Sequence, residues 1–257
     1  MAVIALTSAS ASPGVTTTAV GLALLWPRPV VLVDADPTGA AGVLAGYLRG
    51  TLDTPRGLIE VALSPADTRE ALREVVVPWP GTTVSFVAGP RSTTQAPALR
   101  DLWEPLADVL AEFDEQGQDV IIDAGRLGLL GSPLPLLGRA DVTALLTRTT
   151  LPALAAARSH VDAVRRDRAW SNPAVVLVGE GEPYRTPDVS RALELPVIAT
   201  IADAPDHASV FSRGVAPGRG FDTGPLLRSL QATIAGLRAQ VGRSRLALTA
   251  LTAEAAR

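Results

Sequence analysis

The stretch SASASPGVTTT, residues 8–18, lies between an apolar run that ends at Leu6 and a helical pattern over residues 16–25. A strand, a loop of small residues and a helix N-terminus together make a phosphate cradle. Small residues let backbone N–H groups converge on an anion, and the helix dipole favours negative charge. The consensus phosphate loop also has a lysine directly before the Ser or Thr that binds magnesium, and Val15 stands at that position. A plain strand-to-helix turn, capped by the hydroxyls of residues 16–18, explains the same stretch equally well.

Acidic residues follow two later apolar runs. VVLVDADPTG, residues 30–39, contains Asp34 and Asp36, and DVIIDAG, residues 119–125, contains Asp123. In open α/β sheets the carboxyl ends of parallel strands border the crevice that binds ligands. Asp is also common in turns that follow strands. Three such features in this order favour a ligand site over three unrelated turns.

The remaining chain alternates apolar runs with helical patterns. Strands are predicted at 2–6, 29–34, 84–88, 119–123, 142–147, 174–178 and 197–201, and helices at 16–25, 98–116, 151–168 and 186–193. Most of the strands are apolar throughout, as strands buried on both faces are. We therefore expect an α/β fold with a mostly parallel sheet of about seven strands and helices on both faces. One domain over residues 1–257 is expected, with a helical insertion at 51–80 and a C-terminal helix at 224–257.

Composition excludes several kinds of site. The 257 residues contain no cysteine and two histidines, so disulfides and a cysteine nucleophile are excluded, and a zinc site of about four ligands is not expected. A net charge of −3 argues against nucleic acid as a partner. The chain has no signal-peptide pattern and no membrane-spanning run, so a cytoplasmic location is expected. All 23 basic residues are arginines.

On these residues the chain resembles the ParA/MinD family of deviant Walker A ATPases. The loop of that family reads K-G-G-x-G-K-T-T, its next strand ends in D-x-D-P-Q-G, and its Walker B strand ends in Asp. Alignment through Gly14 and the following threonines places Ser10 at the signature lysine and Val15 at the P-loop lysine. Asp34 and Asp36 fall on the D-x-D pair, and Asp123 on the Walker B acid. The resemblance spans about residues 1–215. It extends to actinobacterial MinD-like proteins with the loop S-P-G-V-T-T-T and to the TadZ/CpaE pilus-positioning branch.

The resemblance implies a Mg-ATP site of defined composition. Its nucleotide loop would comprise Ser12, Pro13, Gly14, Val15, Thr16 and Thr17. The magnesium group would comprise Thr16, Asp34 and Asp123, and Asp36 would be the catalytic residue that helps position the attacking water. Both family lysines are missing, which predicts triphosphate binding weakened by about one to two orders of magnitude per lysine. Arg126 and Arg148 are the residues that could compensate, and Gly179 replaces the asparagine that contacts the base in relatives.

The C-terminal segment has a heptad pattern and a local charge of +4. Five arginines and one acid lie within residues 224–257. Apolar residues recur at alternating three- and four-residue spacing: Leu227, Leu230, Ile234, Leu237, Val241, Leu248, Leu251 and Ala255. The first half fits a closing helix packed on the sheet. For residues 243–257 two interpretations stay open, namely pairing with a partner helix and peripheral contact with the inner face of an anionic membrane.

Three functions fit these observations. The first is a positioning, scaffold or regulatory protein with a degenerate Walker A loop, which binds Mg-ATP weakly or not at all and has little or no enzymatic activity. The second is a working ATPase for partitioning or pilus positioning, with an unorthodox phosphate site. The third is an ATP-dependent amidoligase-type synthetase, which ranks last because those enzymes also need the P-loop lysine. Protein partners are expected, and a homodimer remains open.

Overall fold

The computed structural model describes residues 2–10, 13–39, 42–54, 56–112 and 117–255, with side chains as far as residue 246. Its centre is one eight-stranded sheet in the order β3-β4-β2-β5-β1-β6-β7-β8. The strands are β1 (Val3–Ser8), β2 (Val30–Asp34), β3 (Val77–Pro78), β4 (Val84–Val87), β5 (Asp119–Arg126), β6 (Val142–Arg148), β7 (Pro173–Val178) and β8 (Val197–Ile201). Neighbouring strands are parallel except for β3, which pairs antiparallel with β4 at the sheet edge.

The predicted fold class is confirmed, and all seven predicted strands are present. The additional strand, β3, has two residues and ends in Pro78. It was not predicted because two residues are too few to form a pattern. Proline lacks the N–H that a central strand must donate, which is why such a strand occurs only at an edge.

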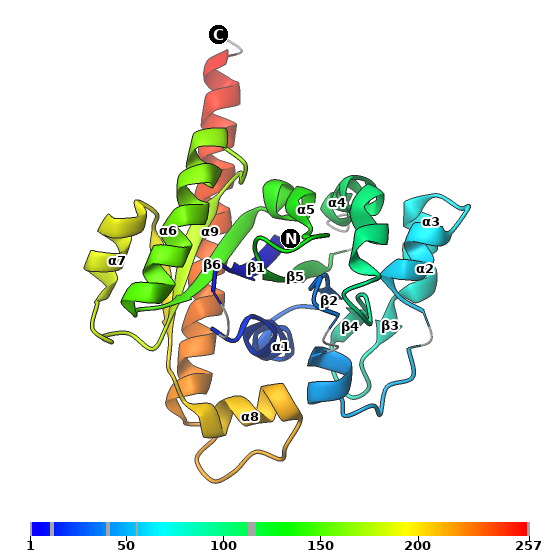
Figure 1. Cartoon of the computed structure of the whole chain (residues 1–257), viewed down its shortest axis with the longest axis horizontal. Helices are drawn as coiled ribbons and strands as arrows, with labels where there is room; N and C mark the ends of the chain where they lie inside the picture. The colour runs from blue at the N-terminus through cyan, green and yellow to red at the C-terminus, as the bar shows by residue number, and fades with distance from the viewer. Residues whose placement is uncertain (1, 11–12, 40–41, 55, 113–116, 256–257) are drawn as a thin grey trace.

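Helices cover both faces of the sheet (Figure 1). One face is covered by α2 (Leu58–Leu63), α3 (Thr68–Val75), α4 (Trp103–Ala111), α5 (Leu134–Arg139), α6 (Leu151–Asp167) and α7 (Thr186–Leu193). The other is covered by α1 (Val15–Leu25), α8 (Pro205–Arg213), α9 (Pro225–Ala255) and the π-helical turn η1 (Gly42–Tyr47). Alternate residues of β1 enter the two cores: Val3 and Ala5 face the first, and Ile4 and Leu6 face the second. This arrangement explains why the strand is apolar throughout.

The prediction of one continuous helix over 98–116 is wrong. The structure has a 3-10 helix, η2 (Ala96–Leu102), followed by the shorter α4. Pro105 accounts for the change, because it has no N–H to donate to the carbonyl group four residues earlier. A continuous α-helix would leave that carbonyl without its partner. The short helices α5 and α8 were not predicted at all.

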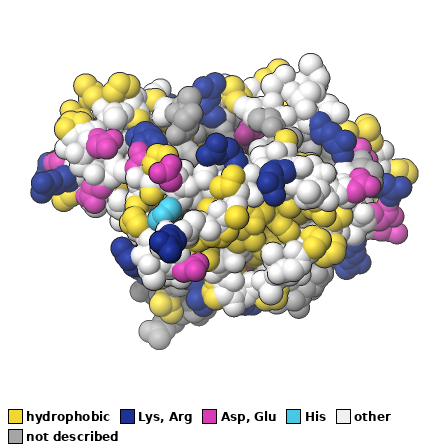
Figure 2. Space-filling model, turned by 90° about the horizontal axis from the view of Figure 1, so that it is seen from below, with side chains coloured by type: hydrophobic (Ala, Val, Ile, Leu, Met, Phe, Trp, Pro, Cys, Tyr) yellow, Lys and Arg dark blue, Asp and Glu magenta, His cyan; other side chains and the backbone are white. Residues whose placement is uncertain are grey.

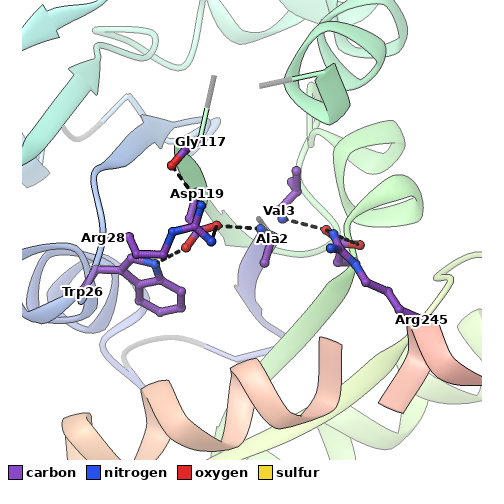
Figure 3. A network of polar contacts seen from close by, with 8 residues as sticks. Ala2, Val3, Trp26, Arg28, Gly117, Asp119 and Arg245 are labelled. Atoms are coloured by element: carbon purple, nitrogen blue, oxygen red, sulfur yellow. Dashed lines mark hydrogen bonds and ion pairs between the residues drawn. The ribbon is translucent and has the colours of Figure 1, made fainter. Parts of the chain in front are cut away.

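The long helix α9 is anchored at the end of the sheet where β1 begins (Figure 3). Its heptad residues up to Val241 are buried against the sheet, and the helix continues through Gly242 without a break. Beyond that point Arg245 donates to both carboxylate oxygens of Asp141, at 3.2 and 3.3 Å. The same carboxylate accepts the Val3 N–H at 2.8 Å. The packed part of α9 therefore reaches at least to Arg245. The side chains of Leu248 and Leu251 lie outside the described residues.

The buried carboxylate of Asp119 holds the neighbouring backbone in place. Asp119 accepts the Ala2 N–H and the Trp26 indole N–H, both at 2.7 Å. The guanidinium of Arg28 lies 3.8 Å from the same carboxylate and donates to the Gly117 carbonyl (Figure 3). These contacts fix the amino end of β1, so the opposite end of the strand delivers the small-residue loop from a rigid base.

Candidate functional site

The small-residue loop ends in a glycine that begins α1. Gly14 is the N-cap of α1 in the left-handed conformation, with φ 83° and ψ 43°. Its carbonyl accepts the Thr18 N–H at 2.8 Å, and no described side chain caps the helix. The capped-turn interpretation therefore does not hold for the described residues. The first N–H groups of an α-helix have no acceptor within the helix, and the residues that carry them here, Val15 to Thr17, line a pocket where an anion could bind.

A pocket of about 380 Å³ opens over this helix terminus. Its lining comes from three strand ends: the loop after β1, the turn after β2 and the end of β5. The lining residues are Ser8, Ser10, Pro13, Gly14, Val15, Thr16, Thr17, Asp36, Thr38, Gly125 and Arg126. Five of the six predicted nucleotide-loop residues are in this group, and Ser12 lies outside the described residues.

Val15 does not replace the function of a lysine. Its side chain is 7% exposed and packs in the core between the sheet and α1. A short apolar group in this place supplies neither the charge nor the reach needed to contact a phosphate. Ser10, at the other lysine position, lines the pocket but brings only a hydroxyl group.

The three aspartates lie on adjacent strand ends. Asp34 and Asp123 are directly paired in the register of β2 and β5, and both are buried. Asp36 lines the pocket, and its Oδ1 accepts the Thr38 N–H at 2.9 Å. Asp123 accepts the Gly125 N–H at 3.1 Å through Oδ1, while its Oδ2 is buried without a hydrogen-bond partner among the described residues. An orphaned carboxylate oxygen is expensive to bury unless a ligand or water satisfies it.

Burial alters the acid strength of this group. Burial raises the pKa of Asp123 to about 6; the Thr16 hydroxyl and the Gly125 N–H oppose that shift, and the charge of Asp36 adds to it. Burial and the neighbouring charge of Asp123 raise the pKa of Asp34 well above its usual value. A nearby cation would favour the charged form of both groups.

The residue set fits a magnesium ion that arrives with its own ligands. The described residues include no group of three or more His, Asp or Glu side chains arranged to hold a metal ion. Thr16 and the orphaned Oδ2 of Asp123 are instead suited to an ion that already has phosphate oxygens and water around it.

Arg126 is placed beside the loop by a β-bulge. Leu6 pairs with Asp123 but Ser8 pairs with Arg126, so β5 contains one residue more than β1 over this interval. Gly125 takes up the extra length with φ 58°, and a Cβ there would lie 2.3 Å from the carboxyl carbon of Asp36. The Thr7 hydroxyl donates to the Gly125 carbonyl at 3.1 Å, and the Leu127 N–H donates to the Ser8 carbonyl at 2.8 Å. The sequence named Arg126 as a candidate, but the glycine after Asp123-Ala124 was the only sign of the bulge.

A second pocket of about 270 Å³ adjoins the first and shares Pro13, Gly14 and Thr17 with it. It continues over the ends of β6, β7 and β8. Arg148 lines this pocket, but its guanidinium is paired with Asp203 at 2.6 Å. Gly179 follows Val178 of this lining, and its carbonyl accepts the Thr149 hydroxyl at 2.9 Å. A glycine has no side chain with which to make the base contact that the sequence resemblance assigns to an asparagine at this position. Of the two arginines considered from the sequence, Arg148 is therefore already neutralised.

Comparisons with known proteins give a consistent fold. No family model matches the sequence, and no curated protein matches it. Among solved structures, MinD complexed with Mg-ADP from Pyrococcus horikoshii is 16% identical with a TM-score of 0.73, over 95% of this chain and 98% of that one. A chain of the MinC:MinD cell division protein complex from Aquifex aeolicus is 15% identical with a TM-score of 0.73, over 93% of this chain and 96% of that one. An ATP complex of a McdA variant from Cyanothece is 16% identical with a TM-score of 0.68, over 94% and 96%. The chain thus has the fold of the MinD and ParA-family ATPases, as the sequence resemblance predicts.

Proposed function

We propose that this chain is a ParA/MinD-like positioning or scaffold protein whose phosphate cradle is retained but whose Mg-ATP binding is weak, with hydrolysis slow or absent. The observation that supports this most directly is Val15, buried in the core at the position of the P-loop lysine. No lysine exists elsewhere in the sequence to replace it. Phosphoryl transfer depends on positioning and charge stabilisation, so the loss of both lysines affects turnover more than binding.

The retained residues support residual nucleotide binding. When bound, Mg-ATP would supply the anion that the first-turn N–H groups of α1 lack and the cation that the buried carboxylates favour. The loop Pro13–Thr17 would hold phosphate, Thr16 and Asp123 would face the metal ion, and the second pocket has room for a nucleoside. Asp36 would orient a water molecule from the pocket wall.

The proposal is tested by calorimetric titration with Mg-ATP and Mg-ADP together with a phosphate-release assay. We expect a dissociation constant weaker than about 100 μM, which corresponds to less than about 5.5 kcal/mol of binding free energy. Val15→Lys should tighten binding about ten- to hundredfold, because it restores a charge at the cradle. Val15→Gln is the matched control of similar length without charge, and it should not tighten binding. Micromolar affinity in the natural chain, with phosphate release abolished by Asp36→Ala, would overturn the proposal.

A working ATPase is the second candidate, favoured by one specific observation. Thr16 and Asp36 line one pocket together with Arg126, and the buried pair Asp34 and Asp123 lies next to them, with Asp123 in contact with Thr16. An abandoned site has no need to keep this arrangement. The phosphate-release assay above decides between the two candidates.

For partners we propose other proteins, including a second copy of this chain, and not nucleic acid. The solved MinC:MinD complex is of a protein with this fold. On the face seen in Figure 2 the arginine side chains are separated by hydrophobic and acidic ones and form no continuous basic patch. None of the helices in the described residues is long and apolar enough to cross a membrane. Residues 247–257 are the part of the tail that we propose for contact with a partner or a membrane surface.

A further inference from the structure

We propose that Arg126 is the phosphate-binding cation of this site, replacing from the end of β5 the lysines missing from the loop. The ligand class is a phosphate group, carried by a nucleotide or free. The role of Arg126 rests on the proposed function, because it presupposes that the pocket accepts phosphate. It goes further by naming the residue that would supply the positive charge for a phosphate in the pocket.

Two arginines line the pockets, and they differ in whether an acidic side chain pairs with them. Arg126 is exposed, lines the same pocket as Gly14 and Thr16, and makes no ion pair with the residues that the structure describes. Arg148, the other arginine that lines either pocket, is held by Asp203 at 2.6 Å. An unpaired guanidinium in a pocket beside free helix N–H groups is suited to bind phosphate oxygens in a bidentate manner.

A β-bulge with a fixed register determines the position of Arg126. The bulge puts Arg126 in register with Ser8, the last residue of β1 before the loop, and two hydrogen bonds fix that register from both sides. Glycine is the only residue type that fits the bulge at position 125, because the φ there is 58° and a Cβ would collide with the Asp36 carboxylate. Bulges near functional sites redirect a side chain that a regular strand would point elsewhere. Without the extra residue in β5, the side chain at this position would take the opposite face of the sheet.

The test is calorimetric titration of the full chain and three variants with Mg-ADP and, separately, with inorganic phosphate. The variants are Arg126→Ala, Arg126→Lys and Arg100→Ala. Arg100 is the matched control, an exposed arginine that lines neither pocket. Melting curves of all four proteins confirm that each is folded.

We expect Arg126→Ala to weaken Mg-ADP binding about 10- to 150-fold, the effect of one hydrogen-bonded charge. Arg126→Lys should recover part of that loss, and Arg100→Ala should bind like the natural chain. If the same variants change the binding of inorganic phosphate in the same way, free phosphate is a sufficient ligand for Arg126. Dependence seen with Mg-ADP alone would show that the second pocket must hold a nucleoside as well.

Two results overturn the role of Arg126. One is Arg126→Ala binding Mg-ADP as tightly as the natural chain. The other is no binding of Mg-ADP or phosphate to the natural chain at millimolar concentration, which would leave the scaffold proposal standing. Tight binding with rapid turnover would instead remove the scaffold proposal, and Arg126 would keep its role if its alanine variant binds more weakly.

Discussion

At the scale of single residues, the site combines acids that are poorly solvated with a position that has lost its charge. Asp123 is fully buried and one of its oxygens has no partner among the described residues. Val15, at the position of the P-loop lysine, is buried in the core at the wall of the pocket and brings no charge to it. Asp123 is therefore buried without an ion-pair partner among the described residues, and Val15 supplies no charge that could serve as one.

Asp123 should therefore reduce stability as the pH rises. Its pKa is raised in the folded state to about 6, so between about pH 4 and pH 6 the folded chain binds more protons than the unfolded chain. Stability from this group is present at low pH and is lost as the pH rises through that window. Asp123→Asn removes the titration and can still accept the Gly125 N–H. The free energy of unfolding of the Asp123→Asn variant should exceed that of the natural chain. This difference should grow between about pH 4 and pH 6 and reach roughly 3 kcal/mol at pH 7.

Urea denaturation at pH 4, 5, 6 and 7, without magnesium or nucleotide, measures this difference. Asp222→Asn is the control, because Asp222 is exposed in the loop before α9. A difference between Asp123→Asn and the natural chain that does not change with pH would contradict the expectation. The gain should also include relief of Asp34, since the charge of Asp123 helps to raise the pKa of that neighbour.

At the scale of elements, α9 combines a packed helix with a distal segment. The heptad residues Leu227 to Val241 are buried, and Arg245 connects the next turn to Asp141, which directly precedes β6. Leu246, one residue later, is 74% exposed. The boundary between the packed part and the proposed interaction segment thus falls near residue 246, not at Gly242, where the sequence pattern alone suggested a change.

Two truncations test this boundary. Removal of residues 247–257 keeps Arg245 and should change the free energy of unfolding by no more than about 0.5 kcal/mol. Removal of residues 243–257 also breaks the contact with Asp141, a partly exposed pair worth up to about 1 kcal/mol. Arg245→Ala in the full chain should reproduce this extra loss in urea denaturation. Unfolding caused by the shorter truncation would show that residues 247–257 belong to the core.

The shorter truncation also tests the proposed contact of the tail. Removal of residues 247–257 should abolish co-sedimentation with anionic phospholipid vesicles or with a partner protein. Binding that disappears at high salt indicates contact driven by charge, whereas binding that survives indicates helix pairing through apolar residues. Unchanged binding after the truncation would rule out residues 247–257 as the contact.

At the scale of the whole molecule, one sheet joins all the parts of the site. The loop after β1, the turn after β2 and the end of β5 come from the three central strands, and the second pocket extends along β6 to β8. Because one eight-stranded sheet connects residues 3–201, we infer a single domain, with α2 and α3 as an insertion between β2 and β4. Several large apolar side chains are exposed on its surface, among them Leu130, Leu134 and Leu151.

Self-association should not depend on nucleotide. In the family that the sequence resembles, the signature lysine reaches the nucleotide of the partner subunit, and Ser10 cannot make that contact. Light scattering of the natural chain should give the same mass with and without Mg-ATP. The double variant Ser10→Lys/Val15→Lys is the comparison in which a dependence could appear. A natural chain that is monomeric alone and dimeric only with Mg-ATP would refute this expectation.

The sequence by itself determined the fold class, the order of the strands along the chain and the set of residues at their ends. These depend on local patterns: apolar runs long enough to be buried on both faces, and small or acidic residues directly after them. Five of the loop residues and Asp36 line one pocket, and Asp34 and Asp123 pair with each other near the carboxyl ends of β2 and β5; their roles at the site stay predictions. The pattern did not resolve η2 or β3, where a single proline or a two-residue pairing decides the outcome, and it missed the short helices α5 and α8.

Only the tertiary structure decided which of these groups can act on a ligand. The bulge that brings Arg126 to the loop, the pairing of Arg148 with Asp203 and the raised pKa of Asp123 each depend on residues far apart in sequence. The same is true of Arg245, whose partner Asp141 lies 104 residues away. The burial of a side chain and the charged groups near it depend on which residues surround it. Those surroundings are formed by strand register and helix packing, which no local pattern specifies.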